Sequence, residues 1–207
     1  MRVWFMRETN SICTGCARGC NITISSRENK IYRQTPRENN EVNSSWMCDS
    51  GRMQYHLLES SGRLTEPMVK KGKSHEVVDW PEAINHVVSG LSKFSGDEIA
   101  IIGSARMTNE ELYLLKTLSE TLNVDIVDII KVEGEGDEYL SHKDKRPNSN
   151  GAKAILNLRS PGSKLNTIKK RIKEGTIKAL LVYGENIVRF GFDENLLKGI
   201  KFMVSSN

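Results

Sequence analysis

The sequence predicts a chain of the α+β to α/β class, in which a small β-rich module precedes the start of an open, mostly parallel α/β sheet. Three observations predict this class. Apolar and polar residues alternate on both sides of a polar turn near residue 28, as in a half-buried hairpin. From about residue 80, short apolar runs alternate with amphipathic helical patterns, as in a parallel sheet. All four cysteines of the 207 residues lie within the first 48.

The predicted elements of the N-terminal module are short. A strand at Val3–Arg7 leads toward the first cysteines. The hairpin arms are Asn21–Ser26 and Lys30–Thr35, which alternate in polarity around a polar turn. Apolar residues at helical spacing predict a helix over Asp49–Leu58. Trp46, just before this helix, is expected to pack beside the last cysteine.

A different pattern begins after residue 60. Met68–Lys71 and Glu76–Val78 are predicted to form a small hairpin, and Pro81 is suited to the first turn of a helix. The apolar residues of that helix are expected to make one buried face. They are Ile84, Val87, Val88, Leu91 and Phe94.

Strands and helices then alternate to the end of the chain. The predicted elements are a strand at Ile99–Gly103, a helix opened by the capping box Thr108-Asn109-Glu110-Glu111, a strand at Val124–Ile130, a helix at Ser163–Glu174, and strands at Lys178–Tyr183 and Lys201–Ser205. This order predicts an open, mostly parallel sheet. Ligands of such sheets bind at the carboxyl ends of strands, where Gly103-Ser104 and Gly184-Glu185-Asn186 would lie. Residues 131–151 are turn-rich and charged, and we expect a flexible linker there rather than a phosphate loop.

The four cysteines form one motif, C-x2-C-x3-C-x27-C. They are Cys13, Cys16, Cys20 and Cys48. Three thiolates within eight residues, closed by a distant fourth, suit an iron–sulfur cube, which takes one sulfur per iron. Gly15 and Gly19 lie between them, where the backbone must turn close to a bulky ligand. We therefore predict one [4Fe–4S] cluster with these four cysteines as its metal ligands.

Two other interpretations of the cysteines remain open. Structural zinc usually takes two C-x2-C pairs, and the second pair is missing from this sequence. Disulfides are typical of secreted scaffolds, but neither a signal peptide nor a composition of that kind accompanies these cysteines.

The charge of the chain is uneven. The formal net charge is +4, and within residues 1–57 eight Lys and Arg stand against five Asp and Glu. A cube on four thiolates is negative, so nearby basic residues are candidates to offset its charge and raise its potential. They are Arg18, Lys30, Arg33 and Arg52, for each of which a solvated surface is the alternative. The excess is too modest to support a nucleic-acid partner, and no basic stripe interleaved with aromatic residues is present.

No membrane span and no export signal are expected. The longest apolar stretch, Ala179–Tyr183, is too short to cross a bilayer. The first seven residues have neither the apolar run of a secretory signal nor a twin-arginine pair. We expect a cytoplasmic protein, whose attachment to the cytoplasmic face of an inner membrane would come only through partners.

Two segments that carry the cysteines, Ser11–Ile22 and Trp46–Arg52, resemble the [4Fe–4S] domain of the molybdopterin oxidoreductase superfamily. Within that superfamily they resemble in particular the large iron–sulfur subunit of bacterial NADH-quinone oxidoreductase, respiratory complex I. Further segments that look like this large subunit are Arg63-Leu64 with Pro67, Trp80–Ala83, Ser104–Glu111, Arg146–Ala152 and Ile177–Leu180.

The resemblance implies that the four cysteines ligate one [4Fe–4S] cluster. It implies a cluster-binding domain over residues 1–58 and a partial molybdopterin-oxidoreductase-like α/β domain over residues 59–207. Relatives with a molybdenum bis-pterin cofactor typically place a lysine two residues after the fourth cysteine. Ser50 stands at that position, which makes a molybdopterin cofactor doubtful. The flanking Asp49 and Arg52 favour the complex I branch.

The expected function is electron transfer, as an iron–sulfur subunit or fragment of an NADH-quinone oxidoreductase-like complex with other subunits as partners. We expect an oxidoreductase component that is catalytically incomplete alone and has no catalytic residue of its own. The large subunit normally begins with ferredoxin-like segments and has a far longer α/β region, and neither is found in this sequence. The resemblance therefore suggests an internal piece of such a subunit or a split gene product. One alternative is a fragment of a molybdenum-dependent formate dehydrogenase-like oxidoreductase, suggested by Ser104–Arg106 and Thr108–Glu111. The other is a non-redox structural metal-binding module.

Overall fold

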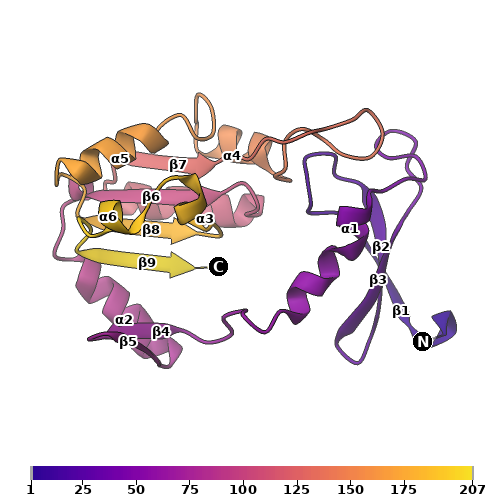
Figure 1. Cartoon of the computed structure of the whole chain (residues 1–207), viewed down its shortest axis with the longest axis horizontal. Helices are drawn as coiled ribbons and strands as arrows, with labels where there is room; N and C mark the ends of the chain where they lie inside the picture. The colour runs from indigo at the N-terminus through magenta and orange to yellow at the C-terminus, as the bar shows by residue number, and fades with distance from the viewer. Residues whose placement is uncertain (1, 207) are drawn as a thin grey trace. The chain divides into compact units, whose positions relative to one another are not determined.

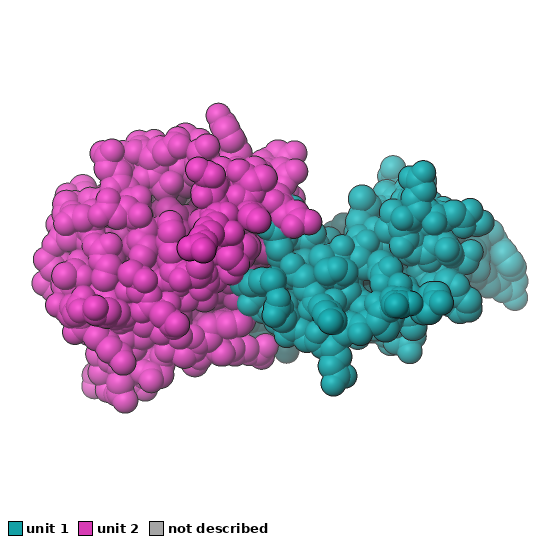
Figure 2. Space-filling model, turned by 90° about the horizontal axis from the view of Figure 1, so that it is seen from above, with its two compact units in different colours: residues 1–63, 131–149 teal, residues 64–130, 150–207 magenta. Residues whose placement is uncertain are grey.

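The computed structural model describes residues 2–206, which form two compact units (Figures 1 and 2). Unit 1 contains residues 1–63 and 131–149, and unit 2 contains residues 64–130 and 150–207. Unit 1 has an antiparallel sheet and unit 2 a parallel one, so the predicted class, α+β to α/β, is confirmed.

The sheet of unit 1 has three antiparallel strands in the order β1-β2-β3. They are β1 (Arg7–Ile12), β2 (Asn21–Arg27) and β3 (Lys30–Pro36). The predicted hairpin is confirmed, and its turn has two residues with positive φ, Glu28 at 50° and Asn29 at 60°. Two such residues form the tight turn whose twist matches that of paired strands.

The strand predicted at Val3–Arg7 is wrong. Val3–Phe5 forms a 3₁₀ turn, η1, and β1 begins only at Arg7. The physical reason is the length of the partner strand. Arg7 pairs with Ser26 near the end of β2, so residues before Arg7 have no neighbouring backbone to pair with.

The helix predicted over Asp49–Leu58 begins as expected but tightens halfway. Its first part is α1 (Asp49–Met53), and its second part is a 3₁₀ helix, η2 (Gln54–Glu59). Trp46, expected to pack beside the last cysteine, is 63% exposed and is not part of the buried cluster. The next residue, Met47, is 6% exposed and lies in one apolar cluster with Cys13, Cys20 and Ile22.

Unit 2 is built on four parallel strands in the order β7-β6-β8-β9. They are β6 (Ile99–Ser104), β7 (Ile126–Ile130), β8 (Ala179–Tyr183) and β9 (Phe202–Ser206). Every residue of β6 is buried, as expected for a central parallel strand covered on both faces. The open, parallel sheet predicted from the alternating pattern is confirmed.

The helices of unit 2 lie against this sheet. The longer ones are α2 (Trp80–Leu91), α3 (Asn109–Thr121) and α5 (Leu165–Lys173). The predicted capping box opens α3, with Thr108 and Glu111 bonding each other's backbone N–H. The smaller elements of the unit are a hairpin, β4 (Met68–Lys71) and β5 (Ser74–Val77), and four short helices, η3 (Gly96–Glu98), α4 (Ser149–Ile155), η4 (Ile187–Phe190) and α6 (Glu194–Leu197). Ser149, the first residue of α4, is grouped with unit 1.

The single apolar face predicted for α2 is wrong. Leu91 is buried in the core, and Val87 and Phe94 pack against it. Ile84 and Val88 instead lie on an outer stripe, with exposures of 56% and 62%. Trp80, four residues before Ile84, extends the same stripe and is 67% exposed. The helix therefore carries apolar residues on an inner and on an outer side.

Candidate metal centre

The cysteines occupy two places in unit 1. Cys13, Cys16 and Cys20 lie in the loop between β1 and β2, with exposures of 7%, 8% and 4%. Cys48 is half-buried and is the N-cap residue of α1. All four thiols are free.

The pairing of β1 with β2 closes the cysteine loop at its neck. Ile12 is paired with Asn21, and immediately inside this pair the Cys13 N–H donates to the Cys20 carbonyl at 2.8 Å. Gly19 has a φ of +66°, which lets the chain turn back into β2 without a steric penalty from a side chain. The first and third cysteines of the motif are thereby held next to each other.

The start of α1 brings the fourth cysteine to the loop. The Gly51 N–H donates to Cys48 Sγ at 3.4 Å, so the thiol caps the helix. A Cβ at position 51 would lie 3.0 Å from Cys13 Sγ and 3.6 Å from Cys48 Sγ. Both sulfurs therefore lie over the bare backbone of Gly51, where two cysteines 35 positions apart in the sequence meet.

A buried asparagine ties these two places together. Asn43 is 4% exposed, and its Oδ1 accepts from the Asn21 N–H at 2.9 Å where β2 begins. Its Nδ2 donates to the Trp46 carbonyl at 3.0 Å, just before Cys48. Gln54 adds a second link, because its Nε2 donates to Thr14 Oγ1 at 3.0 Å. Asn43, Gln54 and Gly51 were not predicted from the sequence, since a single residue gives no signal of the distant contacts it makes in the fold.

Burial and mutual repulsion act on the thiols. Burial, and after it the charges of the other three thiols, raise the pKa of Cys20 to about 11, while the nearby Arg18 acts to lower it. Burial also raises the pKa of Cys13, against a hydrogen bond from the Gly15 N–H that lowers it. The four thiols are therefore close enough to affect one another. Metal binding here would have to displace protons from neutral thiols.

The donor set, four cysteine thiols, is of the kind that iron–sulfur cubes take. Within residues 2–206 no group of three or more Cys, His, Asp or Glu side chains, the four cysteines included, is gathered around one point as a single metal ion would need. Zn–S bonds of about 2.3 Å would bring tetrahedral sulfurs to within about 3.8 Å of each other. A cube instead binds each sulfur to a different iron. Three features of this site suit such a cube. They are the four free thiols, the peptide N–H donors to Cys13 and Cys48, and the surface of Gly51, which carries no side chain.

The segment expected to be a flexible linker is part of unit 1. Residues 131–149 contact the cysteine loop, where the Ala17 N–H donates to the Asp144 carbonyl at 3.0 Å. The Arg18 Nη2 donates to the Asp137 carbonyl at 3.0 Å. Gly134 does not form a phosphate loop, because its N–H donates to the Lys143 carbonyl across a small β-bridge.

A second polar group lies at the carboxyl edge of the parallel sheet in unit 2, as predicted. Ser104 at the end of β6 is fully buried, and its hydroxyl donates to the Glu185 carboxylate at 2.7 Å. Gly184 has a φ of +68°, and a Cβ there would lie 3.1 Å from Ser104 Cβ. Strand order reverses between β6 and β8, so this is the switch point where ligands of open sheets bind.

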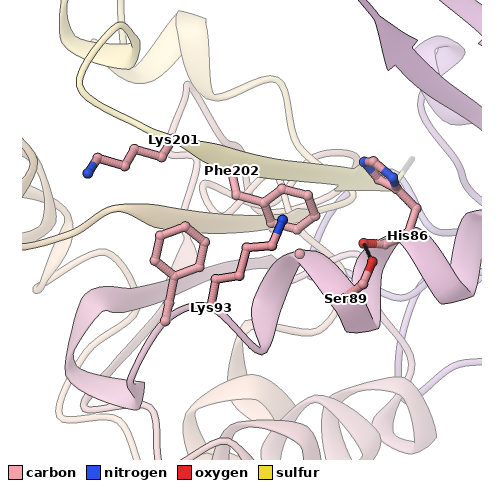
Figure 3. Close-up of a pocket in the computed structure, with 7 residues that line it drawn as sticks. His86, Ser89, Lys93, Lys201 and Phe202 are labelled. Atoms are coloured by element: carbon pink, nitrogen blue, oxygen red, sulfur yellow. Dashed lines mark hydrogen bonds between the residues drawn. The ribbon is translucent and has the colours of Figure 1, made fainter.

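Unit 2 also has a shallow cavity of about 360 Å³ between α2 and the start of β9 (Figure 3). In this view the Phe202 ring covers α2, and Gly90 allows this because a Cβ there would lie 2.3 Å from the ring. Ser89 Oγ donates to the His86 carbonyl at 3.1 Å. The residues lining it are His86, Ser89, Gly90, Lys93, Phe94, Lys201 and Phe202. The sequence did not predict this cavity.

Two family models match the chain. Residues 6–56 match the NADH-ubiquinone oxidoreductase NDSU1/NuoG-like 4Fe-4S domain, and residues 63–141 match the molybdopterin oxidoreductase family.

Curated relatives are similar over somewhat more than half of the chain. An F420-dependent formate dehydrogenase 2 subunit alpha from Methanococcus maripaludis is 34% identical over 120 residues, 56% of this chain. Putative formate dehydrogenases from Staphylococcus aureus N315 and Staphylococcus haemolyticus are 30% and 31% identical, each over 60% of this chain. The alignments span only 18% of the length of the first relative and 14% of the length of the other two.

Proposed function

We propose, from the family matches of residues 6–56 and 63–141, that the chain is an electron-transfer component of an oxidoreductase of the molybdopterin oxidoreductase superfamily. Cys13, Cys16, Cys20 and Cys48 would hold one [4Fe–4S] cluster, which accepts and releases single electrons when bound. The observation that carries this proposal is the meeting of Cys13 and Cys48 over Gly51.

The protein contributes three things to such a cluster. The loop neck and the cap of α1 fix the directions of the thiols. Burial of Cys13, Cys16 and Cys20 keeps water from the sulfurs. The N–H groups of Gly15 and Gly51 donate to Cys13 and Cys48, and such bonds stabilise negative charge on a sulfur.

Iron and acid-labile sulfide analysis of anaerobically purified protein tests the cluster. We expect four of each per chain and an EPR signal after reduction with dithionite. Cys20→Ala should lose the cluster or convert it, whereas Ser50→Ala, beside Cys48 but without a thiol, should keep four irons. Colourless protein with one zinc per chain would contradict the proposal.

The branch of the superfamily is a separate part of the proposal. The 4Fe-4S match at residues 6–56 supports the NADH-quinone oxidoreductase type. The named relatives support a formate dehydrogenase-like type at least as well. The expectation that a molybdopterin cofactor is doubtful loses its support, because residues 63–141 match the molybdopterin oxidoreductase family.

Purification of the chain from its native cells, with whatever subunits accompany it, separates the two branches. Molybdenum and a fluorescent oxidised pterin after denaturation, together with formate-dependent dye reduction, support the formate dehydrogenase-like type. NADH-dependent dye reduction without molybdenum supports the NADH-quinone type. A cluster that takes up no electron over the accessible potential range contradicts both and favours a structural metal-binding module. Because one relative is named a subunit, we propose partner subunits in either case.

A further inference from the structure

Among the basic residues of unit 1, Arg18 lies within the cysteine loop itself. It lies two residues from Cys16 and two from Cys20, so its Cα is within about 7.6 Å of either Cα. Its side chain is half-buried, and its Nε is buried without a hydrogen-bond partner. Its Nη2 donates to a neutral group, the Asp137 carbonyl. Within residues 2–206 no carboxylate lies within ion-pair distance of this guanidinium, although Arg18 is near enough to the Asp137 carboxyl to help lower its pKa.

Two of the other three basic candidates have ion-pair partners, and the third, Arg52, lies in α1 outside the cysteine loop. Arg33 donates to Ser25 Oγ and pairs with the Glu8 carboxylate at 3.2 Å. Lys30 pairs with the Glu59 carboxylate at 3.0 Å. Each of these two positive charges is offset by a neighbouring negative one. Arg18, by contrast, is the basic residue inside the cysteine loop, and in the part of the chain that the structure describes it has no ion-paired carboxylate.

Residues 131–149 keep Arg18 in this position. The preceding residue, Ala17, is held by the Asp144 carbonyl, and the guanidinium is held by the Asp137 carbonyl. The Asp137 carboxylate accepts from the Tyr139, Leu140 and Ser141 N–H groups, which fixes the turn that presents this carbonyl. The loop is thus pinned at two successive residues by one segment.

We infer that Arg18 is a positioning residue that raises the reduction potential of the cluster, and that residues 131–149 fix it for this role. This inference rests on the proposed function. The oxidised cluster takes up one electron and becomes more negative by one charge. A fixed positive charge nearby stabilises the reduced form more than the oxidised form.

A potentiometric titration followed by EPR, with dithionite as the electron donor, tests the inference on the full chain. Arg18→Gln should hold four irons but favour the oxidised form about tenfold more than the unmodified chain, a fall of about 59 mV for one electron. Arg18→Lys keeps a positive charge and should restore at least half of that change. Arg33→Gln is the matched control, and its equilibrium should change less than threefold because Arg33 is paired with Glu8.

Two results would overturn the inference. One is an Arg18→Gln protein with four irons and an unchanged potential. The other is loss of iron from both Arg18→Gln and Arg18→Met, because Arg18 would then be needed for assembly rather than for the potential. Failure of the unmodified chain to hold four irons and four sulfides contradicts the proposed function instead, so the two failures are distinguishable.

Discussion

Gly51 is the residue at which the two parts of the cysteine motif meet. We expect Gly51→Ala to lower iron content and to destabilise the folded chain by about 1–3 kcal/mol, the usual cost of overpacking. The added methyl would lie 3.0 Å from Cys13 Sγ and 3.3 Å from Met47 Cε. Iron analysis and thermal denaturation measure both effects. Gly62→Ala is the control, since its Cβ would approach only Ser60 Oγ, at 4.0 Å. Equal behaviour of the two variants would show that the Gly51 surface is not required.

Asn43 is the polar side chain that joins β2 to the segment before Cys48. Asn43→Leu should lower the free energy of unfolding by about 1–3 kcal/mol, because the Asn21 N–H and the Trp46 carbonyl lose their partner away from water. Urea denaturation measures the change. Asn40 is exposed, and Asn40→Leu is expected to change stability by less than about 0.5 kcal/mol. A neutral Asn43→Leu would disprove the role of these bonds.

Cys20 gives the iron-free chain a stability that depends on pH. A thiol whose pKa rises on folding stabilises the fold below its unfolded value and stops doing so as the pH rises through its folded value. For Cys20 these values are 9.0 and about 11. With a chelator present, the melting temperature should fall between these two pH values, and Cys20→Ser should reduce that fall. A melting temperature independent of pH over this range would contradict the burial of this thiol.

At the scale of an element, helix α2 carries apolar residues both on an inner, buried side and on an outer, exposed side. Leu91 faces the core, whereas Ile84 and Val88 lie on the exposed stripe. Leu91→Ala should cost about 2–5 kcal/mol of unfolding free energy, because it leaves a cavity. The double change Ile84→Glu with Val88→Glu should leave stability nearly unchanged and reduce binding of an apolar dye. Denaturation and dye fluorescence test both. A large loss of stability in the double variant would mean that the stripe is covered.

Elements with a local signal were predictable. The hairpin around Glu28 and Asn29 was visible in the alternation of its arms, and the capping box at Thr108 in four residues. Trp46 and Met47 were not distinguishable, because which neighbour turns inward depends on how α1 meets the cysteine loop. The segment 131–149 looked like a linker because it contacts the loop through backbone carbonyls, which no side-chain pattern reveals.

The candidate site was predictable to a different degree. Spacing alone pointed to the four cysteines, whose role as metal ligands stays a prediction, as does the domain boundary between residues 58 and 59. Their surroundings were not predictable, since Asn43 and Gln54 act through single long-range hydrogen bonds. Arg18 could be named from its place between two cysteines, but not told apart from Arg33 and Lys30. Their ion pairs depend on how the chain folds.

At the scale of the whole molecule, the notable feature is the order in which the chain builds its two units. None of the helices within residues 2–206 is long and apolar enough to cross a bilayer. The parallel sheet is regular and well buried, while unit 1 draws its residues from two separate stretches of chain. The polypeptide leaves unit 1 after residue 63, builds β6 and β7, and returns with residues 131–149 before it completes unit 2.

This return has a consequence for biosynthesis. Asp144 follows Cys48, the last cysteine, by 96 positions, so at about 5–20 residues per second a ribosome needs about 5–19 s to make the segment 131–149 as far as Asp144. During that interval a nascent chain already displays all four thiols without the backbone contacts from Asp137 and Asp144. Iron delivered this early would bind an incompletely folded cysteine loop, where it would be open to oxidation and to exchange with competing ligands. Productive loading therefore belongs after translation has passed this point.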